Sequence, residues 1–593
     1  MARTIATTSE LLARAVGSFQ AGELDLACAM CFSILQAQPA HLDALLLVAA
    51  IWLRQGQAGA ARRMLDQALL TAPGHPEANK MLRAMVATPE GGTLSPTDSA
   101  QANLEAGMKH WEEHHYHAAL ACWQRAVALD PARSDLLNYR ARAFAALGID
   151  DAAEADFARA LALKPDFAEA HNNLGALLHR LGRREAAAAS YRHAITIRPD
   201  YALAHSNLGN ALCELKRFDE ALTSYDRAID LKPDYAEAQY NRGNALCNLK
   251  RFDEALASYD LAIDLKPDYA EVHWNKALLH LLVGDFQNGW QKYEWRWRRS
   301  GRMNQPRAYP QPLWLGDTDV CGKRILLSSE QGFGDSLQFC RYVTQVAALG
   351  AVVILEAPAA LAPLLKPLAG VTEFVAQGEA LPSFDFHCPL LSLPLAFGTT
   401  LDSLSGKPYL VAPPKRITDW TRALGKASQP RVGLAWSGNA NVSNDHNRAI
   451  PLSRFSQGLP SGIEYIQLQK DVRAADQAWL DQHPEIRSFD SRITDFGDTA
   501  ALIASLDLVI TIDTSITHLA GALGKEVWIL LPHVPDWRWL LDRSDSPWYD
   551  AATLFRQPTP GDWDSVLAAA RQALAEKYRL QRSSAGGKQG HPQ

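Results

Sequence analysis

Residues 205–238 read HSNLGNALCELKRFDEALTSYDRAIDLKPDYAEA, and this stretch decides the fold of the first half of the chain. A close copy, QYNRGNALCNLKRFDEALASYDLAIDLKPDYAEV, begins at Gln239, and related copies begin at His171 and His273. The period is 34 residues, and prolines keep its phase at Pro131, Pro165, Pro199, Pro233 and Pro267, while an earlier pair, Pro39 and Pro73, has the same spacing. A fixed period of this length predicts stacked helical repeats, because one such unit is too small to bury its apolar face alone.

The pattern resembles the tetratricopeptide repeat, in which each unit is a pair of antiparallel helices followed by a helix-breaking proline. The resemblance covers about residues 10 to 300 and implies a concave surface that binds a protein or peptide partner. A Pro/Gly/Ser-rich segment, PEGGTLSPTDSA, interrupts it at residues 89–100. We therefore predict N-terminal repeats over residues 1–88, a linker over 89–100 and the main array over 101–301.

One polar column in the array has two possible explanations. It consists of the asparagines at one repeat position, Asn173, Asn207, Asn241 and Asn275. An amide side chain can both donate to and accept from the backbone of an extended peptide, and the column is similar to the asparagine ladder of the O-GlcNAc transferase repeats. The alternative is that the asparagine is repeat consensus without a ligand. In the preceding repeat, Tyr139 occupies the position of the asparagine.

Other features of the array have plainer explanations. The run KHWEEHHYHAAL (109–120) contains His110, His114, His115 and His117, but the repeat phase places His114 and His115 in a solvated turn. The segment WQKYEWRWRRS (290–300) could suggest single-stranded nucleic acid, yet Tyr293 keeps the core phase of Tyr191, Tyr225 and Tyr259. We expect Trp290, Trp295 and Trp297 to seal the last repeat and dock it on the next domain, without nucleic-acid binding.

Length and composition exclude several classes of protein. A chain of 593 residues is too long for one core, and its formal net charge of −6 argues against a general binder of nucleic acids or membrane surfaces. No apolar run approaches a transmembrane segment, and the N-terminus has no signal-peptide pattern, so we expect a cytoplasmic protein. The eight cysteines form no disulfide framework, and the lone pair Cys28 and Cys31 lies in a helical pattern.

After about residue 302 the period ends and apolar runs typical of strands alternate with helical segments. We expect strands at 323–329, 351–356, 385–390, 431–436, 463–468, 508–513 and 527–531. A proline-containing connection, residues 408–430, separates two α/β halves, which we place at 302–412 and 413–580, with a disordered tail at 581–593. The fold class is therefore α plus α/β, a tetratricopeptide solenoid followed by twin Rossmann-like domains that face a cleft, as in GT-B glycosyltransferases.

Two segments carry the chemistry of this second half. SSEQGFGDSLQFCRYV (328–343) follows the first strand, where Gly332 and Gly334 are expected to allow a tight turn before a helix from Asp335 to Leu349. DTSITHLAGALG (513–524) follows a later strand. Together they resemble glycosyltransferase family 9, the heptosyltransferase-like enzymes. The resemblance implies that Asp335 is the general base. It also implies that Gly334 and the later segment bind the sugar donor and its phosphates through Asp513, Thr514, Ser515, Ile516 and His518.

Several further residues are candidates for the donor site. The loop after the strand at 431–436 supplies Ser437, Gly438 and Asn439 near the phosphates, and Arg448 and His446 as cationic side chains. Phe496 lies at the start of DFGDTAALIASLD (495–507), where the resemblance implies contact with the nucleobase. Arg448 has a surface salt bridge as its alternative, and Asp513 or Thr514 could simply cap a helix. Arg538 could face the cleft or serve structure.

The sequence predicts an enzyme: a glycosyltransferase that moves a sugar from a nucleotide-sugar donor to a protein or peptide acceptor recruited by the repeats. No metal or other cofactor is expected, because the only DxD, residues 317–319, precedes the first strand instead of following one. The alternative is a non-catalytic interaction scaffold with a degenerate GT-B domain.

Overall fold

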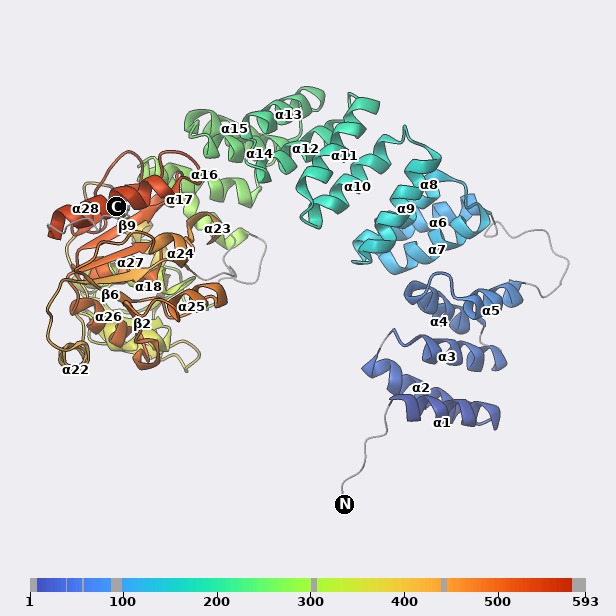
Figure 1. The fold of residues 1–593 in the computed structure, drawn as a ribbon, viewed down its shortest axis with the longest axis horizontal. Helices are drawn as coiled ribbons and strands as arrows, with labels where there is room; N and C mark the ends of the chain where they lie inside the picture. The colour runs from blue at the N-terminus through green and yellow to red at the C-terminus, as the bar shows by residue number, and fades with distance from the viewer. Residues whose placement is uncertain are drawn as a thin grey trace, which may run out of the picture. The chain divides into compact units, whose positions relative to one another are not determined.

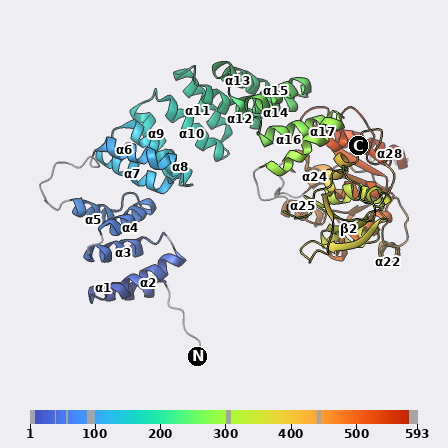
Figure 2. The same ribbon diagram turned by 180° about the vertical axis from the view of Figure 1, so that it is seen from behind.

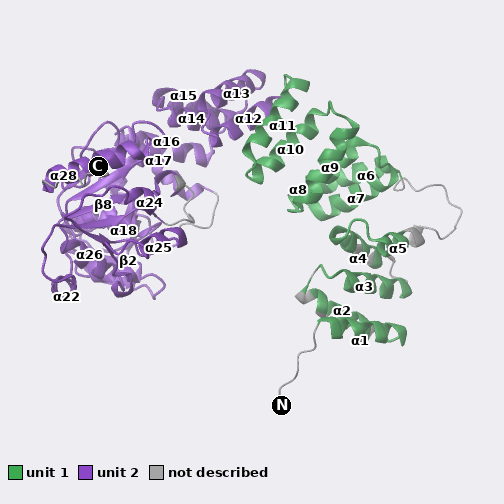
Figure 3. Cartoon of the chain, viewed as in Figure 1, with its two compact units in different colours: residues 1–200 green, residues 201–593 purple. Residues whose placement is uncertain are grey.

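The computed structural model describes residues 8–38, 40–55, 58–86, 99–299, 307–438 and 445–578. The predicted tail at 581–593 and residues 89–98 of the predicted linker lie outside these ranges. The chain divides into two compact units, Met1–Asp200 and Tyr201–Gln593 (Figure 3), and each is described by itself. Among the described residues, no helix has both the length and the apolar character needed to cross a membrane.

Unit 1 is built of antiparallel helix pairs (Figure 1). Its helices are α1 (Thr8–Gln20), α2 (Leu24–Ala37), α3 (Leu42–Arg54), α4 (Ala58–Thr71), α5 (Pro76–Val86), α6 (Ala100–Glu112), α7 (Tyr116–Leu129), α8 (Ser134–Ala146), α9 (Asp150–Leu163), α10 (Ala168–Arg180) and α11 (Arg184–Ile197). A glycine of the first helix receives a ring of the second: a Cβ on Gly107 would lie 2.3 Å from Trp123 Nε1, and one on Gly175 would lie 2.6 Å from Tyr191 Cε1. Close packing therefore requires glycine in these two repeats, whereas α8 has Ala141 at the same position.

Unit 2 continues with the same helix pairs and ends in α/β structure. Its repeat helices are α12 (Ala202–Glu214), α13 (Phe218–Leu231), α14 (Ala236–Asn248), α15 (Phe252–Leu265), α16 (Ala270–Leu282) and α17 (Phe286–Tyr293), followed by the 3₁₀ helix η2 (Glu294–Arg298). Both views place α16 and α17 beside the α/β part (Figures 1 and 2).

The first α/β layer, the N-lobe, contains a parallel sheet of order β3-β2-β1-β4. The strands are β1 (Arg324–Ser328), β2 (Val352–Ala357), β3 (Val371–Ala376) and β4 (Phe386–Pro389), and the α-helices are α18 (Phe333–Phe339), α19 (Val343–Ala348), α20 (Ala362–Leu365) and α21 (Leu393–Ala396). The core of this sheet is apolar, with Leu326 and Ile354 fully buried.

The second layer, the C-lobe, contains a parallel sheet of order β10-β9-β8-β5-β6-β7. Its strands are β5 (Arg431–Ala435), β6 (Glu464–Gln467), β7 (Ile486–Arg487), β8 (Leu508–Ile512), β9 (Val527–Leu531) and β10 (Ala552–Arg556). Its α-helices are α22 (Pro414–Leu424), α23 (Asp445–Arg448), α24 (Leu452–Phe455), α25 (Ala474–Leu480), α26 (Phe496–Ala504), α27 (Ser515–Ala522) and α28 (Trp563–Tyr578). The central strands β5, β8 and β9 are buried along their whole length, which explains their continuous apolar runs.

The structure differs from the predicted elements in three places. The expected helix from Asp335 to Leu349 is broken into α18, a 3₁₀ turn at Cys340–Tyr342 and α19. The expected connection at 408–430 contains α22, which begins with Pro414 in its first turn, where proline is tolerated. The strands β3, β7 and β10 were not predicted, because β3 is partly exposed at the sheet edge, β7 has two residues and β10 is only partly buried.

Candidate functional site

The strand orders show where each α/β layer can hold a ligand. In sequence order the C-lobe strands are arranged 3-2-1-4-5-6, and the N-lobe strands are arranged 3-2-1-4. In both sheets the order in which strands are added therefore reverses beside the first strand. This reversal lies between β5 and β8 in the C-lobe and between β1 and β4 in the N-lobe. Ligands of open parallel sheets bind outside the carboxyl ends of the strands at this reversal. The segments after β1, β5 and β8 carry the predicted site residues of the two lobes except Phe496, which follows β7.

The helices that follow β1 and β8 touch each other through Gly334. A Cβ on Gly334 would lie 2.8 Å from His518 Cδ2 and 3.6 Å from Ser515 Cα. The prediction that Gly332 and Gly334 form a tight turn is wrong, since Gln331, with φ 61°, is the left-handed residue and Gly332 has φ −90°. Glycine at 334 instead permits the close approach of α18 to α27.

Asp335 lies half-buried at the start of α18 and is held by two donors. The backbone N–H of Gly332 donates to its Oδ2 at 2.9 Å, and Nη2 of Arg538 donates to its Oδ1 at 2.5 Å. Burial raises the pKa of Asp335, and the positive charge of Arg538 opposes that rise. The carboxylate thus belongs to an ion pair that joins the N-lobe to the C-lobe.

The sequence left two roles open for Arg538, facing the cleft between the lobes or serving structure, and its position agrees with both. Its buried guanidinium faces Asp335 and also donates to Gln338 Oε1 at 2.5 Å and to Asp536 Oδ1 at 3.0 Å. Asp536 begins the short turn Trp537–Trp539 and accepts from the Arg538 backbone N–H. One arginine therefore fixes the geometry of the carboxylate and connects the two lobes.

Asp513 and His518 lie on the other side of this contact, at the end of β8 and in α27. Burial raises the pKa of Asp513 to about 6, and the nearby carboxylate of Asp536 adds to the rise, while Arg448 and Arg538 oppose it. Its Oδ1 lies 3.8 Å from His518 Nε2. Burial, and then the charge of Arg538, lower the pKa of His518 well below its usual value, so this imidazole is neutral at pH 7. Its Nδ1 lies 2.9 Å from the hydroxyl of Tyr549.

Thr514 caps α27, as the simpler alternative proposed. Its Oγ1 accepts from the backbone N–H of Ile516 at 3.3 Å, and Thr517 Oγ1 accepts from the backbone N–H of Thr514 at 3.4 Å. Ser515 and Ile516 form the first turn and are half-buried, beside the first turn of α18. Asp513 is not a cap, because its carboxylate is surrounded by Arg448, Arg538 and His518.

The loop after β5 brings cationic side chains to the same strand end. Arg448 donates from Nη1 to the backbone oxygen of Asp513 at 2.8 Å and has its Nε 3.6 Å from Asp445 Oδ1. Asp445 also accepts from the Gly438 backbone N–H at 3.2 Å and pairs with Arg473. The candidate Asn439 and the side chain of His446 lie outside the described part of the chain.

Three buried polar atoms around Asp445 have no hydrogen-bond partner among the described residues. They are Ser437 Oγ, Arg448 Nε and Arg473 Nε. Buried polar atoms are nearly always paired, so unpaired donors at a strand end suggest a ligand or ordered water. Arg473 was missed in the sequence, where it follows β6 by six residues in a segment with no motif; only the rule that ligands bind at strand ends could have indicated it.

Phe496, predicted to stack on a nucleobase, is the first residue of α26. Its ring centroid lies 4.9 Å from that of Phe333 at the start of α18, with an interplanar angle of 50°. Phe333 is partly exposed. The two rings form an aromatic pair between the lobes, and base stacking stays a prediction.

The asparagine column makes contacts from one repeat to the next. Within unit 1, Asn173 Nδ2 donates to Asn138 Oδ1 at 3.0 Å. Within unit 2, Asn241 Nδ2 donates to Asn210 Oδ1 at 3.0 Å, and Asn275 Nδ2 donates to Asn244 Oδ1 at 2.8 Å. Asn207 occupies the same repeat position. These bonds give Asn173, Asn241 and Asn275 a structural role that needs no ligand, and peptide binding by the column stays a prediction.

The double variant Asn241→Ala and Asn275→Ala is expected to lower the free energy of unfolding of unit 2 by about 1 to 3 kcal/mol. Each half-buried amide makes an inter-repeat hydrogen bond worth about 0.5 to 1.5 kcal/mol. Urea unfolding followed by circular dichroism measures the change. The matched control is Asn248→Ala, whose exposed amide donates to the carbonyl of Asn244 in its own helix. Equal stabilities of the double variant and the wild type would contradict the role assigned to these bonds.

The end of the array is joined to the N-lobe by buried polar side chains. Trp290 Nε1 donates to the Thr399 carbonyl at 3.0 Å, which confirms docking for this tryptophan. Trp295 instead stacks on His273 with ring centroids 3.7 Å apart, and Trp297 donates to Glu294 Oε2 at 3.2 Å. Arg296, which the sequence analysis did not single out, is 1% exposed and pairs with Glu294 and Glu330. Glu330 lies in the loop that leads from β1 to Asp335.

Comparison with known proteins identifies the repeats. A family described as "TPR repeat" matches residues 141–182, 179–215, 209–250 and 243–284, and one described as "Tetratricopeptide repeat" matches residues 18–85. Protein FlbA of Caulobacter vibrioides is 25% identical over 336 aligned residues, with 51% of this chain and 54% of FlbA covered. The match therefore spans about half the length of that relative.

Solved structures of repeat proteins are also similar to parts of the chain. PilF of Pseudomonas aeruginosa is 19% identical, with 34% of this chain and 89% of that chain covered and a TM-score of 0.31. A thermophilic TPR protein of Thermus thermophilus is 26% identical, with 31% and 100% covered and a TM-score of 0.28. The family matches, together with the helix pairs of both units, show that the chain carries tetratricopeptide repeats, a module of protein interaction, ahead of a region of parallel sheets.

Proposed function

We propose that the chain is a glycosyltransferase of GT-B architecture, similar to family 9, which transfers a sugar from a nucleotide sugar to a protein or peptide held by the repeats. One observation carries the proposal. The helices at the reversal points of the two parallel sheets lie against each other, with Gly334 of one lobe against His518 of the other and with both Asp335 and Asp513 near the Arg538 guanidinium. Two motifs that resemble the same enzyme family, about 180 residues apart in sequence, meet at this point.

In the proposed reaction the N-lobe supplies the general base, and the C-lobe stabilises the leaving diphosphate. Asp335 takes the proton of the acceptor hydroxyl as its oxygen bonds to the anomeric carbon, and the bond from that carbon to the nucleoside diphosphate breaks. The leaving diphosphate takes the bonding electron pair and gains negative charge. The first turn of α27 and Arg448 would stabilise that charge through backbone N–H groups, the helix dipole and a guanidinium. No metal is required in this scheme.

Replacing Arg448 by alanine tests the donor site. The variant loses a charge-assisted contact of about 1.5 to 3 kcal/mol, so affinity for a nucleoside diphosphate should fall about ten- to a hundredfold. Calorimetric titration should show a smaller loss for the bare nucleoside, which has no phosphate. Arg454→Ala is the matched control, because Arg454 pairs with Asp564 at 2.9 Å on an exposed surface and should leave affinity unchanged. Equal losses for both ligands would mean that Arg448 shapes the lobe instead of holding phosphate.

A specific contact favours a second candidate, a scaffold without turnover. Asp335 is engaged by Arg538, and Gly334 lies against His518, so the lobes meet directly at the proposed reaction centre. A scaffold would retain this contact permanently, whereas an enzyme must open it to admit substrates. Limited proteolysis with and without a nucleoside diphosphate distinguishes them: ligand-dependent protection around α18 and α27 supports the enzyme, and an unchanged pattern without ligand binding supports the scaffold.

A further inference from the structure

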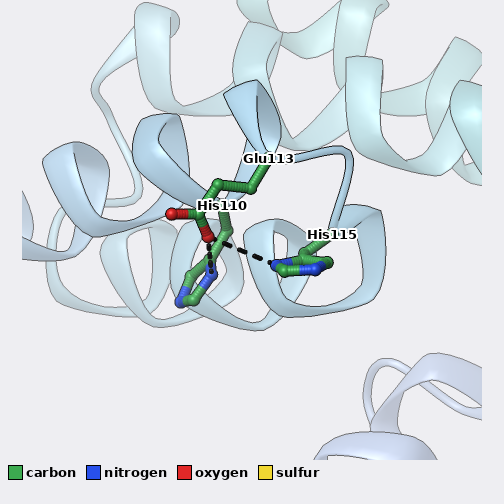
Figure 4. Close-up of side chains that lie close together, drawn as sticks. All are labelled: His110, Glu113 and His115. Atoms are coloured by element: carbon green, nitrogen blue, oxygen red, sulfur yellow. Dashed lines mark ion pairs between the residues drawn. The ribbon is translucent and has the colours of Figure 1, made fainter.

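A group of three metal-ligand side chains lies at the end of the first helix of one repeat in unit 1. His110 lies in the last turn of α6, Glu113 is its C-cap residue, and His115 follows in the turn to α7 (Figure 4). Their nearest ligand atoms all lie within 4.8 Å of one another. Glu113 Oε2 lies 3.9 Å from His110 Nδ1 and 3.3 Å from His115 Nδ1.

The backbone of the turn fixes these positions. His114 adopts φ 58°, a left-handed conformation that reverses the chain, and the backbone N–H of His115 donates to the carbonyl of His110 at 2.8 Å. This bond is the 6→1 bond of a helix-terminating motif. It brings the backbone of His115 close to that of His110, so the approach of these two imidazoles is a consequence of the fold.

The other repeats show that this composition is specific to one turn. One period on from His110, the chain has Phe144, Leu178, Leu212, Leu246 and then His280. The positions equivalent to Glu113 are Leu147, Leu181, Leu215, Leu249 and Val283, and those equivalent to His115 are Ile149, Arg183, Arg217, Arg251 and Asp285. The repeat fold therefore needs neither carboxylate nor imidazole here, and two histidines and a glutamate replace residues that are mainly apolar or basic.

The geometry agrees with a zinc site that has one open position. Donor atoms bound to zinc at about 2.0 to 2.2 Å in a tetrahedron are about 3.3 Å apart, close to the observed 3.3 and 3.9 Å. His110 Nδ1 is buried and has no hydrogen-bond partner among the described residues. Glu113 and His115 are exposed, which leaves room for water as a fourth ligand. We propose that His110, Glu113 and His115 bind a borderline divalent cation such as Zn²⁺ at this turn.

Zinc titration of the untagged, chelator-treated full chain tests the site. The disrupting variant combines His110→Leu, Glu113→Leu and His115→Arg, which are the residues of the repeats at Leu178, Leu181 and Arg183, so the repeat should still fold. The wild type is expected to bind one more equivalent of Zn²⁺ than this variant, with affinity in the micromolar range, and Mg²⁺, which prefers oxygen ligands, should not compete.

His114→Gly is the matched control, because it removes a neighbouring histidine and installs the glycine found at the left-handed positions Gly148 and Gly182. It should retain the zinc equivalent. Equal zinc binding by the wild type and the triple variant would overturn the proposal, as would loss of the equivalent in His114→Gly, since a histidine outside the group would then hold the ion.

Discussion

Arg296→Met is expected to lower the free energy of unfolding of unit 2 by about 3 to 5 kcal/mol at neutral pH, the range found when one partner of a buried ion pair is removed. The guanidinium of Arg296 donates to Glu294 Oε1 at 2.6 Å, to Glu330 Oε1 at 2.8 Å and to Ser392 Oγ at 2.6 Å. Methionine fills similar space but leaves two carboxylates without their cation.

The loss of stability should depend on pH in a defined direction. Burial already raises the pKa of Glu330, and Arg296 opposes the rise. Without Arg296 this pKa rises further, so the folded variant binds more protons than the unfolded chain. Stability of the variant therefore falls as pH rises through the raised pKa and recovers as pH is lowered. Urea unfolding followed by tryptophan fluorescence at neutral and mildly acidic pH measures both effects.

Arg299→Met is the control for this experiment, because Arg299 belongs to the same segment but pairs with Glu271 at 2.7 Å where both side chains are about 30% exposed. Its loss should cost about 1 kcal/mol or less. Equal effects of the two substitutions would show that Arg296 contributes no more than a surface ion pair. A larger loss for Arg296 would show that the last repeat stabilises the loop of Glu330, which leads to Asp335.

The predictable parts of the fold are those with a local signal. A period of 34 residues specifies the repeats, because turns, glycine contacts and prolines recur at this interval along the sequence. The strands β1, β2, β5, β6, β8 and β9 are buried runs of apolar residues, and the structure places each within about two residues of the expected bounds. The strand β3 lacked such a run, because Thr372 and Glu373 face solvent at the edge of the sheet.

The candidate site was predictable only where a motif marks it. Asp335 and Asp513 each follow a strand in a segment with a family resemblance, and the structure brings their helices together. Arg538 lies 203 residues from its partner Asp335, and Arg296 lies 96 residues from Ser392. No local pattern pairs residues at such separations, so their roles depend on tertiary packing. The same limit explains why GFGD was interpreted as a turn signal. The residue that excludes a side chain at Gly334 is His518, which is distant in sequence, so the local pattern could not show this contact.

Asp335→Asn is expected to reduce turnover about a hundredfold or more, as for the loss of a general base. Asparagine has the size of aspartate, and its one carbonyl oxygen can still accept from Arg538 or from the Gly332 N–H, but it cannot take a proton from an acceptor hydroxyl. Release of nucleoside diphosphate from a nucleotide sugar that the wild type turns over measures the rate. Affinity for the nucleoside diphosphate should be nearly unchanged, because Asp335 acts on the acceptor.

The pH dependence separates a base from a residue that only supports the lobes. Because burial raises the pKa of Asp335, wild-type turnover should fall as pH drops through that raised value and the carboxylate becomes protonated. The variant has no such group, so its residual rate should lose this acidic limb. Asp317→Asn makes the same chemical change at an exposed turn before β1 and should keep both rate and profile. Wild-type turnover in Asp335→Asn would exclude Asp335 as the base. A slow variant with the wild-type pH profile would mean that the ion pair with Arg538 supports the lobes while another group accepts the proton.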